Sequence, residues 1–508
     1  MLRQVKTENG WLHGIEAADP RITAFKGIPF AAPPVGPNRW RAPQPCESWE
    51  GVREAVRFGP ISMQWIPGLG SDVYCREWHV DPEIPMSEDC LYLNVWTGAK
   101  SAEEKRPVLV WFFGGGLQCG YTAEMEFDGE RIARRGIVVV TVNYRVGALG
   151  FLTHPQISAE QPEAPANFGN LDQQAGLRWV QRNIAAFGGD PDNVTIAGQS
   201  AGGGSVMTQL ACKANAGLFS RAVVMSAMIF DPYMRREVGR PVPLKEAEKK
   251  GTDFFAYLGV STLEEAREID AVTLQRRYEQ YMESHAPFFT VQDDLICCGD
   301  PISLYVKGDC LDVAMMAGCT SAEFPNSIDA ESESGLCAEA RRLFGDQADT
   351  FLALPGAREH REGLGYAPVS GIECTVKGVL SQVAETGRTG YCYCFDPDIP
   401  GWDNPGTFHS SDLWFFFETL AKCWRPFTGR HYDLARQMCD YFCNFIRTGN
   451  PNGSDLNGEP LPAWSAWTAE KPCTMRFLGS GAEADCAPLP PLKQFLSDRI
   501  LERIRSLA

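Results

Sequence analysis

Apolar residues along this chain gather in short runs that alternate with longer segments of helical spacing. Four runs, 107–113, 137–144, 194–197 and 222–226, are almost wholly apolar or β-branched, which is typical of parallel strands buried on both faces. Between two of them, segment 171–187 carries apolar residues at helical spacing: Leu171, Ala175, Val180, Ile184 and Phe187. The alternation predicts an α/β fold with a large, mostly parallel, twisted central sheet and helices on both faces.

Further along, the pattern extends this sheet without dividing the chain. Weaker runs at 313–318 and 390–395 add strands, and 492–507 has the apolar stripe of an amphipathic terminal helix. There is no internal repeat, low-complexity tract or long linker. We therefore expect one domain that covers residues 1–508.

Two other segments predict helices. Residues 230–290 are charged and of helical character, so we expect a helical insertion there rather than a separate domain. Within it, Ser261, Thr262, Leu263 and Glu264 have the pattern of a capping box. Residues 411–446 predict an aromatic-rich helix.

The net charge of the chain argues against two classes of binding partner. The formal net charge of −17 argues against a nucleic-acid-binding protein, which needs a basic face to release counterions, and against docking on anionic membranes. No run approaches the about 18 apolar residues of a membrane span. The first ten residues lack the apolar core of a signal peptide. We expect a cytoplasmic protein with no membrane association.

The eighteen cysteines are scattered, with no C-x-x-C pair. Cys392 and Cys394 share one face of a predicted strand, and Cys439 and Cys443 are one helical turn apart, so the two pairs form a conceivable zinc site. No histidine-rich ligand spacing accompanies them. We interpret them as small buried apolar side chains and expect no metal and no cofactor.

The run at 194–197 leads into Gly198-Gln199-Ser200-Ala201-Gly202, which fits G-x-S-x-G, and helical spacing follows. Strand, sharp turn with a serine at its tip, helix is the arrangement of a nucleophile elbow. The glycines avoid a Cβ clash where strand and helix approach each other, and the helix N-terminus favours negative charge beside the serine. A simple Gly-Ser loop is the alternative interpretation of these five residues.

A nucleophilic serine needs a histidine to take its proton and a carboxylate to orient that histidine. In the strand-serine-helix arrangement the acid and then the histidine follow the serine along the chain. Four histidines do so: His285, His360, His409 and His431. His409 lies in a Pro/Gly loop directly after the 390–395 strand and is the candidate base, whereas His431 heads a helix and is interpreted as a surface residue.

For the acid, Glu323 follows a strand end as Ser200 does, and a solvated surface carboxylate is the alternative. Asp412 is the second candidate, three residues after His409. The run Gly114–Gly116 ends the 107–113 strand, and its backbone N–H groups can approach an oxyanion closely. A nucleotide-binding glycine loop is disfavoured because no lysine follows it.

Taken together, these motifs resemble the type-B carboxylesterases, the branch of the α/β-hydrolases that includes the cholinesterases and the para-nitrobenzyl esterases. The matching blocks are Phe25–Ala31, Glu88–Val95, Asn143–Gly147, Asn183–Gly203 and Asn450–Gly453. The resemblance implies an α/β-hydrolase fold with helical insertions over the active site. It also implies the roles of seven residues: Ser200 as nucleophile, Glu323 as acid, His409 as base, Gly115, Gly116 and Ala201 as oxyanion donors, and Ser226 beside the acid.

Three positions depart from the family pattern. Phe113 stands where many relatives have His or Tyr before the glycines. Gln199 stands where many have Glu, which removes a charge that attracts cationic substrates. Ser62 stands where secreted members have the cysteine that pairs with Cys90, which agrees with a reducing compartment.

We therefore expect a serine hydrolase that cleaves small neutral carboxylic esters, with feruloyl-type (hydroxycinnamate) esters among the possible substrates. The candidate pocket aromatics are Trp65, Phe112, Phe113, Trp414, Phe415, Phe416 and Phe417, of which Phe113, Trp414 and Phe415 are the ones assigned to the substrate pocket. The alternative, favoured for at least half of them, is that they belong to the core. The alternatives are a catalytically silent cholinesterase-like interaction module, and an amidase or carbamate hydrolase with the same triad. The expected partner is a small-molecule ester, and the sequence indicates no oligomeric state.

Overall fold

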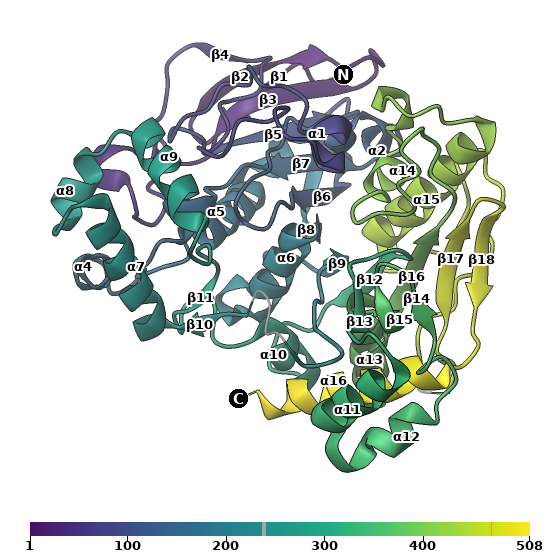
Figure 1. The fold of residues 1–508 in the computed structure, drawn as a ribbon. Helices are drawn as coiled ribbons and strands as arrows, with labels where there is room; N and C mark the ends of the chain where they lie inside the picture. The colour runs from purple at the N-terminus through teal and green to yellow at the C-terminus, as the bar shows by residue number, and fades with distance from the viewer. Residues whose placement is uncertain (236–239, 469, 508) are drawn as a thin grey trace.

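A computed structural model describes residues 1–235, 240–468 and 470–507. Its main feature is a thirteen-stranded sheet (Figure 1) in the order β1-β2-β3-β5-β7-β6-β8-β9-β12-β16-β17-β18, with β4 paired to β2. The strand bounds are β1 Gln4–Thr7, β2 Gly10–Glu16, β3 Thr23–Pro29, β4 Val52–Ala55, β5 Tyr92–Thr97, β6 Arg106–Phe112, β7 Val138–Val142, β8 Gly189–Gln199, β9 Arg221–Met225, β12 Ala314–Thr320, β16 Gly390–Asp396, β17 Thr474–Leu478 and β18 Gly481–Asp485.

All six strands predicted from apolar runs lie at the centre of this sheet. Neighbouring strands from β7 through β6, β8, β9, β12 and β16 to β17 pair in parallel. The outer pairs are antiparallel except β2–β4, which is parallel. The fold class is therefore as expected. The single-domain expectation stays a prediction, and the continuity of the sheet from β1 to β18 supports it.

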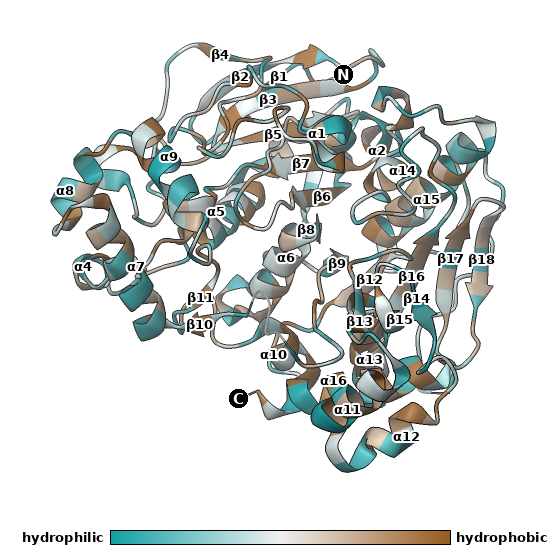
Figure 2. Cartoon of the chain, in the orientation of Figure 1, coloured by the Kyte–Doolittle hydropathy of each residue, from teal (hydrophilic) through white to brown (hydrophobic). Residues whose placement is uncertain are grey.

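Alternate residues of the central strands enter two separate cores. On β6, Val108, Val110 and Phe112 join one cluster, and Leu109 and Trp111 join the other. Because successive side chains of a strand point to opposite faces, a strand buried on both faces must be apolar throughout. Figure 2 shows the central strands in the colours of hydrophobic residues.

Helices cover both faces. Their bounds are α1 Val73–Glu77, α2 Glu130–Arg134, α3 Gly147–Phe151, α4 Pro155–Glu160, α5 Phe168–Asn183, α6 Ala201–Ala211, α7 Leu244–Leu258, α8 Leu263–Glu268, α9 Ala271–Met282, α10 Pro301–Lys307, α11 Glu333–Phe344, α12 Ala348–Leu352, α13 Gly371–Glu385, α14 Leu413–Phe416, α15 Gly429–Thr448 and α16 Pro491–Ser506. Helices α5, α6, α13 and α16 pack on one core, and α2, α3, α14 and α15 on the other. Two small sheets, β10-β11 and β13-β15-β14, complete the described part; their strands are β10 Val242–Pro243, β11 Val291–Gln292, β13 Pro325–Ile328, β14 His360–Arg361 and β15 Gly365–Ser370.

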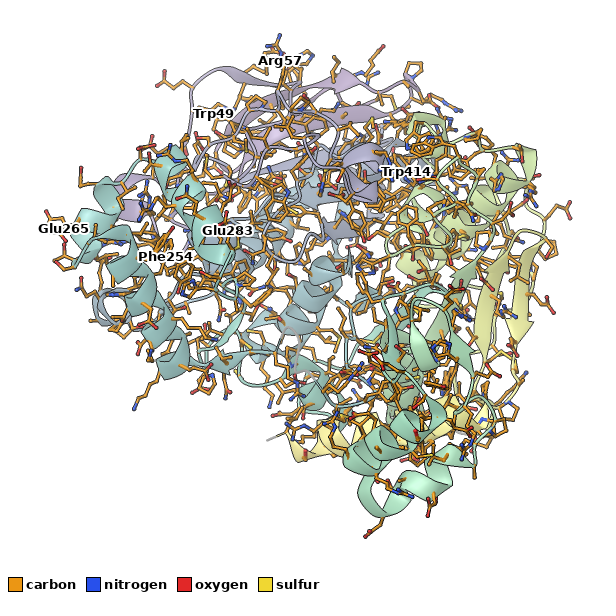
Figure 3. The ribbon with its side chains drawn as sticks, in the orientation of Figure 1. Trp49, Arg57, Phe254, Glu265, Glu283 and Trp414 are labelled. Atoms are coloured by element: carbon orange, nitrogen blue, oxygen red, sulfur yellow. A yellow bond between two sulfur atoms is a disulfide. The ribbon has the colours of Figure 1, made fainter. Side chains whose placement is uncertain are left out.

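The predicted insertion consists of α7, α8 and α9, and residues 236–239 of it lie outside the described residues. These helices stand at one side of the sheet (Figure 1) around an aromatic cluster in which Phe254 (labelled in Figure 3) packs against Tyr278 and Tyr281. The capping box is present but begins one residue later than predicted, with Thr262 as the cap and Glu265 as the residue that reaches back.

The predicted helix 411–446 is two helices, α14 and α15. Pro426 cannot donate a backbone hydrogen bond, and Thr428 caps the second helix together with His431. His431 was interpreted as a surface residue, and this was wrong: the side chain is buried and its Nδ1 accepts from the Thr428 N–H at 3.0 Å. A capping role for histidine has no sequence signature as clear as that of Ser-x-x-Glu.

Cys90 is a free, buried thiol, whereas Cys473 and Cys486 form a disulfide that the sequence did not predict. Within the described ranges, no helix combines the length and the hydropathy that a membrane crossing requires.

Candidate active site

Strand β8 ends at Gln199 and α6 begins at Ala201, so the turn between them consists of Ser200. Its backbone has φ 56° and ψ −127°, a strained conformation for a residue with a Cβ. The Ser200 N–H donates to the Met225 carbonyl oxygen at 2.9 Å, and its own carbonyl accepts from Gly204 at 2.9 Å. These bonds hold the serine at the carboxyl edge of the sheet.

The glycines on either side are required by close backbone contacts. A Cβ on Gly202 would lie 2.1 Å from the Phe112 carbonyl oxygen, and one on Gly198 would lie 2.4 Å from the Gly202 carbonyl. Both distances are far below van der Waals contact, so strand β6, strand β8 and helix α6 meet only because these side chains are absent. The strand-serine-helix prediction is thus confirmed as geometry.

His409 and Glu323 come from loops after neighbouring parallel strands, β16 and β12. The imidazole Nδ1 lies 2.5 Å from Glu323 Oε2, and both residues are buried. The other carboxylate oxygen accepts from the Thr320 N–H at 3.1 Å. The carboxylate thus fixes the plane of the ring and favours the tautomer with the proton on Nδ1.

That tautomer leaves His409 Nε2 as an acceptor. The Gln199 amide nitrogen donates to it at 3.2 Å. Gln199 thus contacts the nitrogen that a catalytic base uses, directly beside Ser200. The sequence had suggested only that Gln199 removes a charge.

Asp412 lies close to this group but contacts a different partner. Its Oδ2 accepts from the Tyr393 hydroxyl at 2.8 Å, and the side chain is fully buried. Burial, with a smaller contribution from the Glu323 charge, raises the pKa of the Asp412 carboxyl to about 7. Of the two acid candidates, the structure brings Glu323 and not Asp412 to the His409 ring.

Ser226 lies at the end of β9, buried and with φ 50°. Its N–H donates to the Gly318 carbonyl oxygen of β12 at 2.8 Å. In the described part of the chain its hydroxyl has no hydrogen-bond partner. Ser226 thus joins two of the strands that carry the site residues.

The glycine run follows β6, on the other side of β8. Gly115 has φ 99° and Gly116 has φ 63°, and a Cβ on Gly115 would lie 2.3 Å from the Cys119 carbonyl oxygen. Both glycines line the same cavity as Ser200. Ala201 is the first residue of α6, where the N–H groups have no partner within the helix. The three N–H groups are therefore suited to binding an anion.

Two cavities meet at Ser200 and share only Gly116 and Phe289 besides the serine. One, of about 430 Å³, includes His409 and Gln199. The other, of about 300 Å³, includes Ala201 and has mainly apolar walls from Leu117, Met207, Ala227, Ile229, Phe230, Pro241, Pro301 and Ile302, with Arg240 and Asp300 also in its lining. Such volumes suit small ligands.

Of the aromatic residues predicted for the pocket, Trp65 lines the larger cavity, and the others line neither cavity in the described part of the chain. Phe113, Trp414 and Phe415 are each at most 1% exposed and line neither cavity. Phe113 stacks on Tyr144 at 4.1 Å between ring centroids, and Trp414 (Figure 3) donates to Glu77 of α1 at 3.2 Å. The aromatic residues that do line the cavities are Trp65, Tyr74, Trp78, Phe127, Phe230, Phe289 and Phe324.

The expected insertion at 230–290 contributes few residues to the cavity walls. Among the described residues, its helices α7 to α9 line neither cavity, and only Phe230 and the segments 240–241 and 289–290 do. The helices α7 to α9 therefore supply none of the described lining of the two cavities, although Tyr278 of α9 donates to Gln118, which lines the larger one. Their apolar faces are taken up by packing with Trp40, Leu149 and neighbouring core residues.

A serine at a strained strand-helix turn, a buried histidine-carboxylate pair and a glycine run, all at one edge of a mostly parallel sheet, define an α/β-hydrolase. The carboxylesterase family model matches residues 2–348 and 370–485. The chain belongs to the carboxylesterase family, and it is a carboxylic ester hydrolase.

Individual proteins similar to this chain are esterases or cholinesterases by name. The chain is 32% identical to cocaine esterase of Oryctolagus cuniculus over 89% of this chain and 88% of that protein, and 41% identical to cholinesterase of Mus musculus over 93% and 83%. It is 32% identical to fumonisin B1 esterase of Sphingopyxis macrogoltabida over 68% of this chain, a match that spans 61% of that enzyme. A solved PNB esterase superposes with a TM-score of 0.78 at 28% identity, over 98% of this chain and 99% of that one.

Proposed function

We propose that the protein cleaves small neutral esters through an acyl-enzyme intermediate on Ser200, with His409 as the base and Glu323 as the acid. The observation that carries the proposal is the 2.5 Å contact between His409 Nδ1 and Glu323 Oε2 beside a strained serine. A base oriented in this way presents Nε2 toward the elbow.

In the proposed reaction His409 Nε2 releases the Gln199 amide, takes the Ser200 proton as the hydroxyl attacks, and then protonates the leaving alcohol oxygen. Glu323 stabilises the imidazolium that forms in between. The N–H groups of Gly115, Gly116 and Ala201 receive the oxyanion. Water then releases the acyl group by the reverse path.

Neutral substrates are proposed because Gln199, beside the nucleophile, carries no charge. An aromatic acyl group, including the feruloyl type, belongs to the same proposal, since Phe230 and Phe289 line the smaller cavity. A cytoplasmic setting is also a proposal, supported by Ser62, which leaves Cys90 unpaired.

The test is a set of Ser200→Ala, Glu323→Gln, His409→Ala and Ser200→Ala/His409→Ala variants assayed with p-nitrophenyl butyrate. Each single variant should lose at least about a thousandfold in kcat, and the double variant should be barely worse than Ser200→Ala, because triad members act as a unit. Full activity of Glu323→Gln, together with inactivity of Asp412→Asn, would contradict the acid assignment.

A further inference from the structure

The two cavities receive different halves of an ester. His409 protonates the departing alcohol, so the alcohol must leave through the cavity that contains His409, the one of about 430 Å³. The acyl group then occupies the cavity of about 300 Å³ on the Ala201 side. This assignment rests on the proposed function, because it uses His409 as the proton donor.

The alcohol-side cavity has a wall of carboxyl groups. Glu124 Oε1 accepts from the Tyr121 N–H at 2.8 Å and lies 3.2 Å from His79 Nε2. Glu126, two residues further on, lines the same cavity, as does Asp72 near its exposed end. None of these carboxyl groups has a role in the reaction proposed above.

Glu126 is the unusual member of this wall. Its side chain is 0% exposed, and within the described residues neither carboxyl oxygen has a hydrogen-bond partner. Burial, followed by the neighbouring Glu124 carboxylate, raises the pKa of Glu126 well above its usual range. A side-chain contact with Glu124 acts in the same direction, so the site favours the protonated form of Glu126, which has one O–H donor and one carbonyl acceptor. A buried polar group left in this way is costly unless a ligand satisfies it.

We propose that the alcohol-side cavity binds an alcohol moiety that carries further hydroxyl groups, such as a glycerol or a sugar, and that Glu126 hydrogen-bonds one of them. A hydroxyl both donates and accepts, which matches a neutral carboxylic acid. An ammonium group only donates and would first have to displace the acid proton. Trp65, Tyr74 and Trp78 line the same cavity and provide apolar surface for the C–H groups of such an alcohol. The ring centroids of Tyr74 and Trp78 are 5.5 Å apart.

The substrates that test this differ only in the alcohol. We would measure kcat/KM for 2,3-dihydroxypropyl butyrate and for 2-methylbutyl butyrate, in which a methyl group replaces each hydroxyl, with butyrylcholine as the cationic comparison. The wild-type protein should favour the dihydroxypropyl ester by about tenfold or more, because a site built for a hydroxyl is left unpaired by its methyl analogue.

Variants then locate the effect. Glu126→Leu should abolish the preference by lowering kcat/KM for the dihydroxypropyl ester alone, whereas Glu126→Gln, whose amide also donates and accepts, should retain most of it. The same two substitutions at Glu264, which is exposed on α8, are the matched controls and should leave the ratio unchanged. Turnover of the 2-methylbutyl ester reports whether each variant is folded.

Each outcome has a distinct meaning. A wild-type ratio near or below one overturns the inference even if Glu126→Leu fails to fold. A preference for butyrylcholine that Glu126→Gln weakens also overturns it, in favour of a cation site. If the wild-type protein cleaves none of the esters, the proposed function fails instead.

Discussion

Replacement of Asp412 by Asn tests the electrostatics behind His409, the base in the proposed mechanism. Asp412 is fully buried, and its carboxyl pKa is raised from 3.8 to about 7. Asn keeps an acceptor for the Tyr393 hydroxyl, which now donates to Asp412 Oδ2 at 2.8 Å, but it does not titrate. The variant therefore removes one titration and leaves the packing nearly unchanged.

The sign of the effect follows from proton binding. Between pH 3.8 and about 7 the unfolded chain loses the Asp412 proton while the folded protein keeps it, so the free energy of unfolding of the wild type falls as pH rises. A shift of roughly 3 pKa units corresponds to about 4 kcal/mol, and relaxation around the ionised group leaves about 2–4 kcal/mol. Relative to wild type, Asp412→Asn should thus gain about this much stability between pH 4 and pH 8.

The assay is denaturant unfolding of both proteins at pH 4, 5, 6, 7 and 8, followed by fluorescence and by circular dichroism. The control is Asp329→Asn, which alters an exposed carboxyl and should give a difference that does not change with pH. A flat difference for Asp412→Asn would refute the reasoning, since it would mean that the carboxyl is ionised in the folded protein throughout. Esterase activity should survive the substitution if Glu323 is the acid.

Three further outcomes are expected. Gln199→Glu should shift kcat/KM toward butyrylcholine relative to the neutral 2-methylbutyl ester, because a close charge is worth about 1–4 kcal/mol; a wild type that already prefers the cation would contradict this. Gly202→Ala should lower stability by more than about 2 kcal/mol, since its Cβ would lie 2.1 Å from a carbonyl oxygen, whereas Gly204→Ala, whose Cβ meets nothing within 4 Å, should be neutral or stabilising in the same unfolding assay. Thiol titration of the unfolded, unreduced protein should find about 16 reactive groups, which are the 18 cysteines less Cys473 and Cys486; nearly complete pairing would also contradict a reducing compartment.

The central strands were predictable because burial on both faces requires an apolar residue at every position, and such a run is visible in the sequence. Val108 to Phe112 serve two cores, so every position is apolar. The elbow was predictable for a similar reason: Gly198 and Gly202 are demanded by contacts within a few residues of Ser200 and with the adjacent strand β6. Chain order then led to His409 and Glu323.

The residues that line the cavities have no comparable local pattern in the sequence. Whether an aromatic residue faces a cavity or the core depends on which distant segments meet it, and Trp414 differs from Trp78 only in that respect. From the sequence alone, Glu126 resembles an ordinary surface carboxylate. Nothing in the 125–127 segment indicates that helix α14 and the 420–422 turn will cover it. Which residues of the insertion line the cavities likewise depends on packing between segments far apart in sequence.

The contact between the Gln199 amide and His409 Nε2 has a consequence for covalent inhibitors. In the proposed mechanism, His409 is not available to Ser200 while the amide occupies that nitrogen, so the resting serine is a weaker nucleophile than the substrate-bound one. Small sulfonyl or phosphoryl fluorides that leave the Gln199–His409 contact intact would therefore react with the less nucleophilic serine. Gln199 and His409 both line the alcohol-side cavity, so a reagent that occupies this cavity competes with their contact. We therefore expect inhibitor potency to follow cavity occupancy more closely than intrinsic electrophilicity.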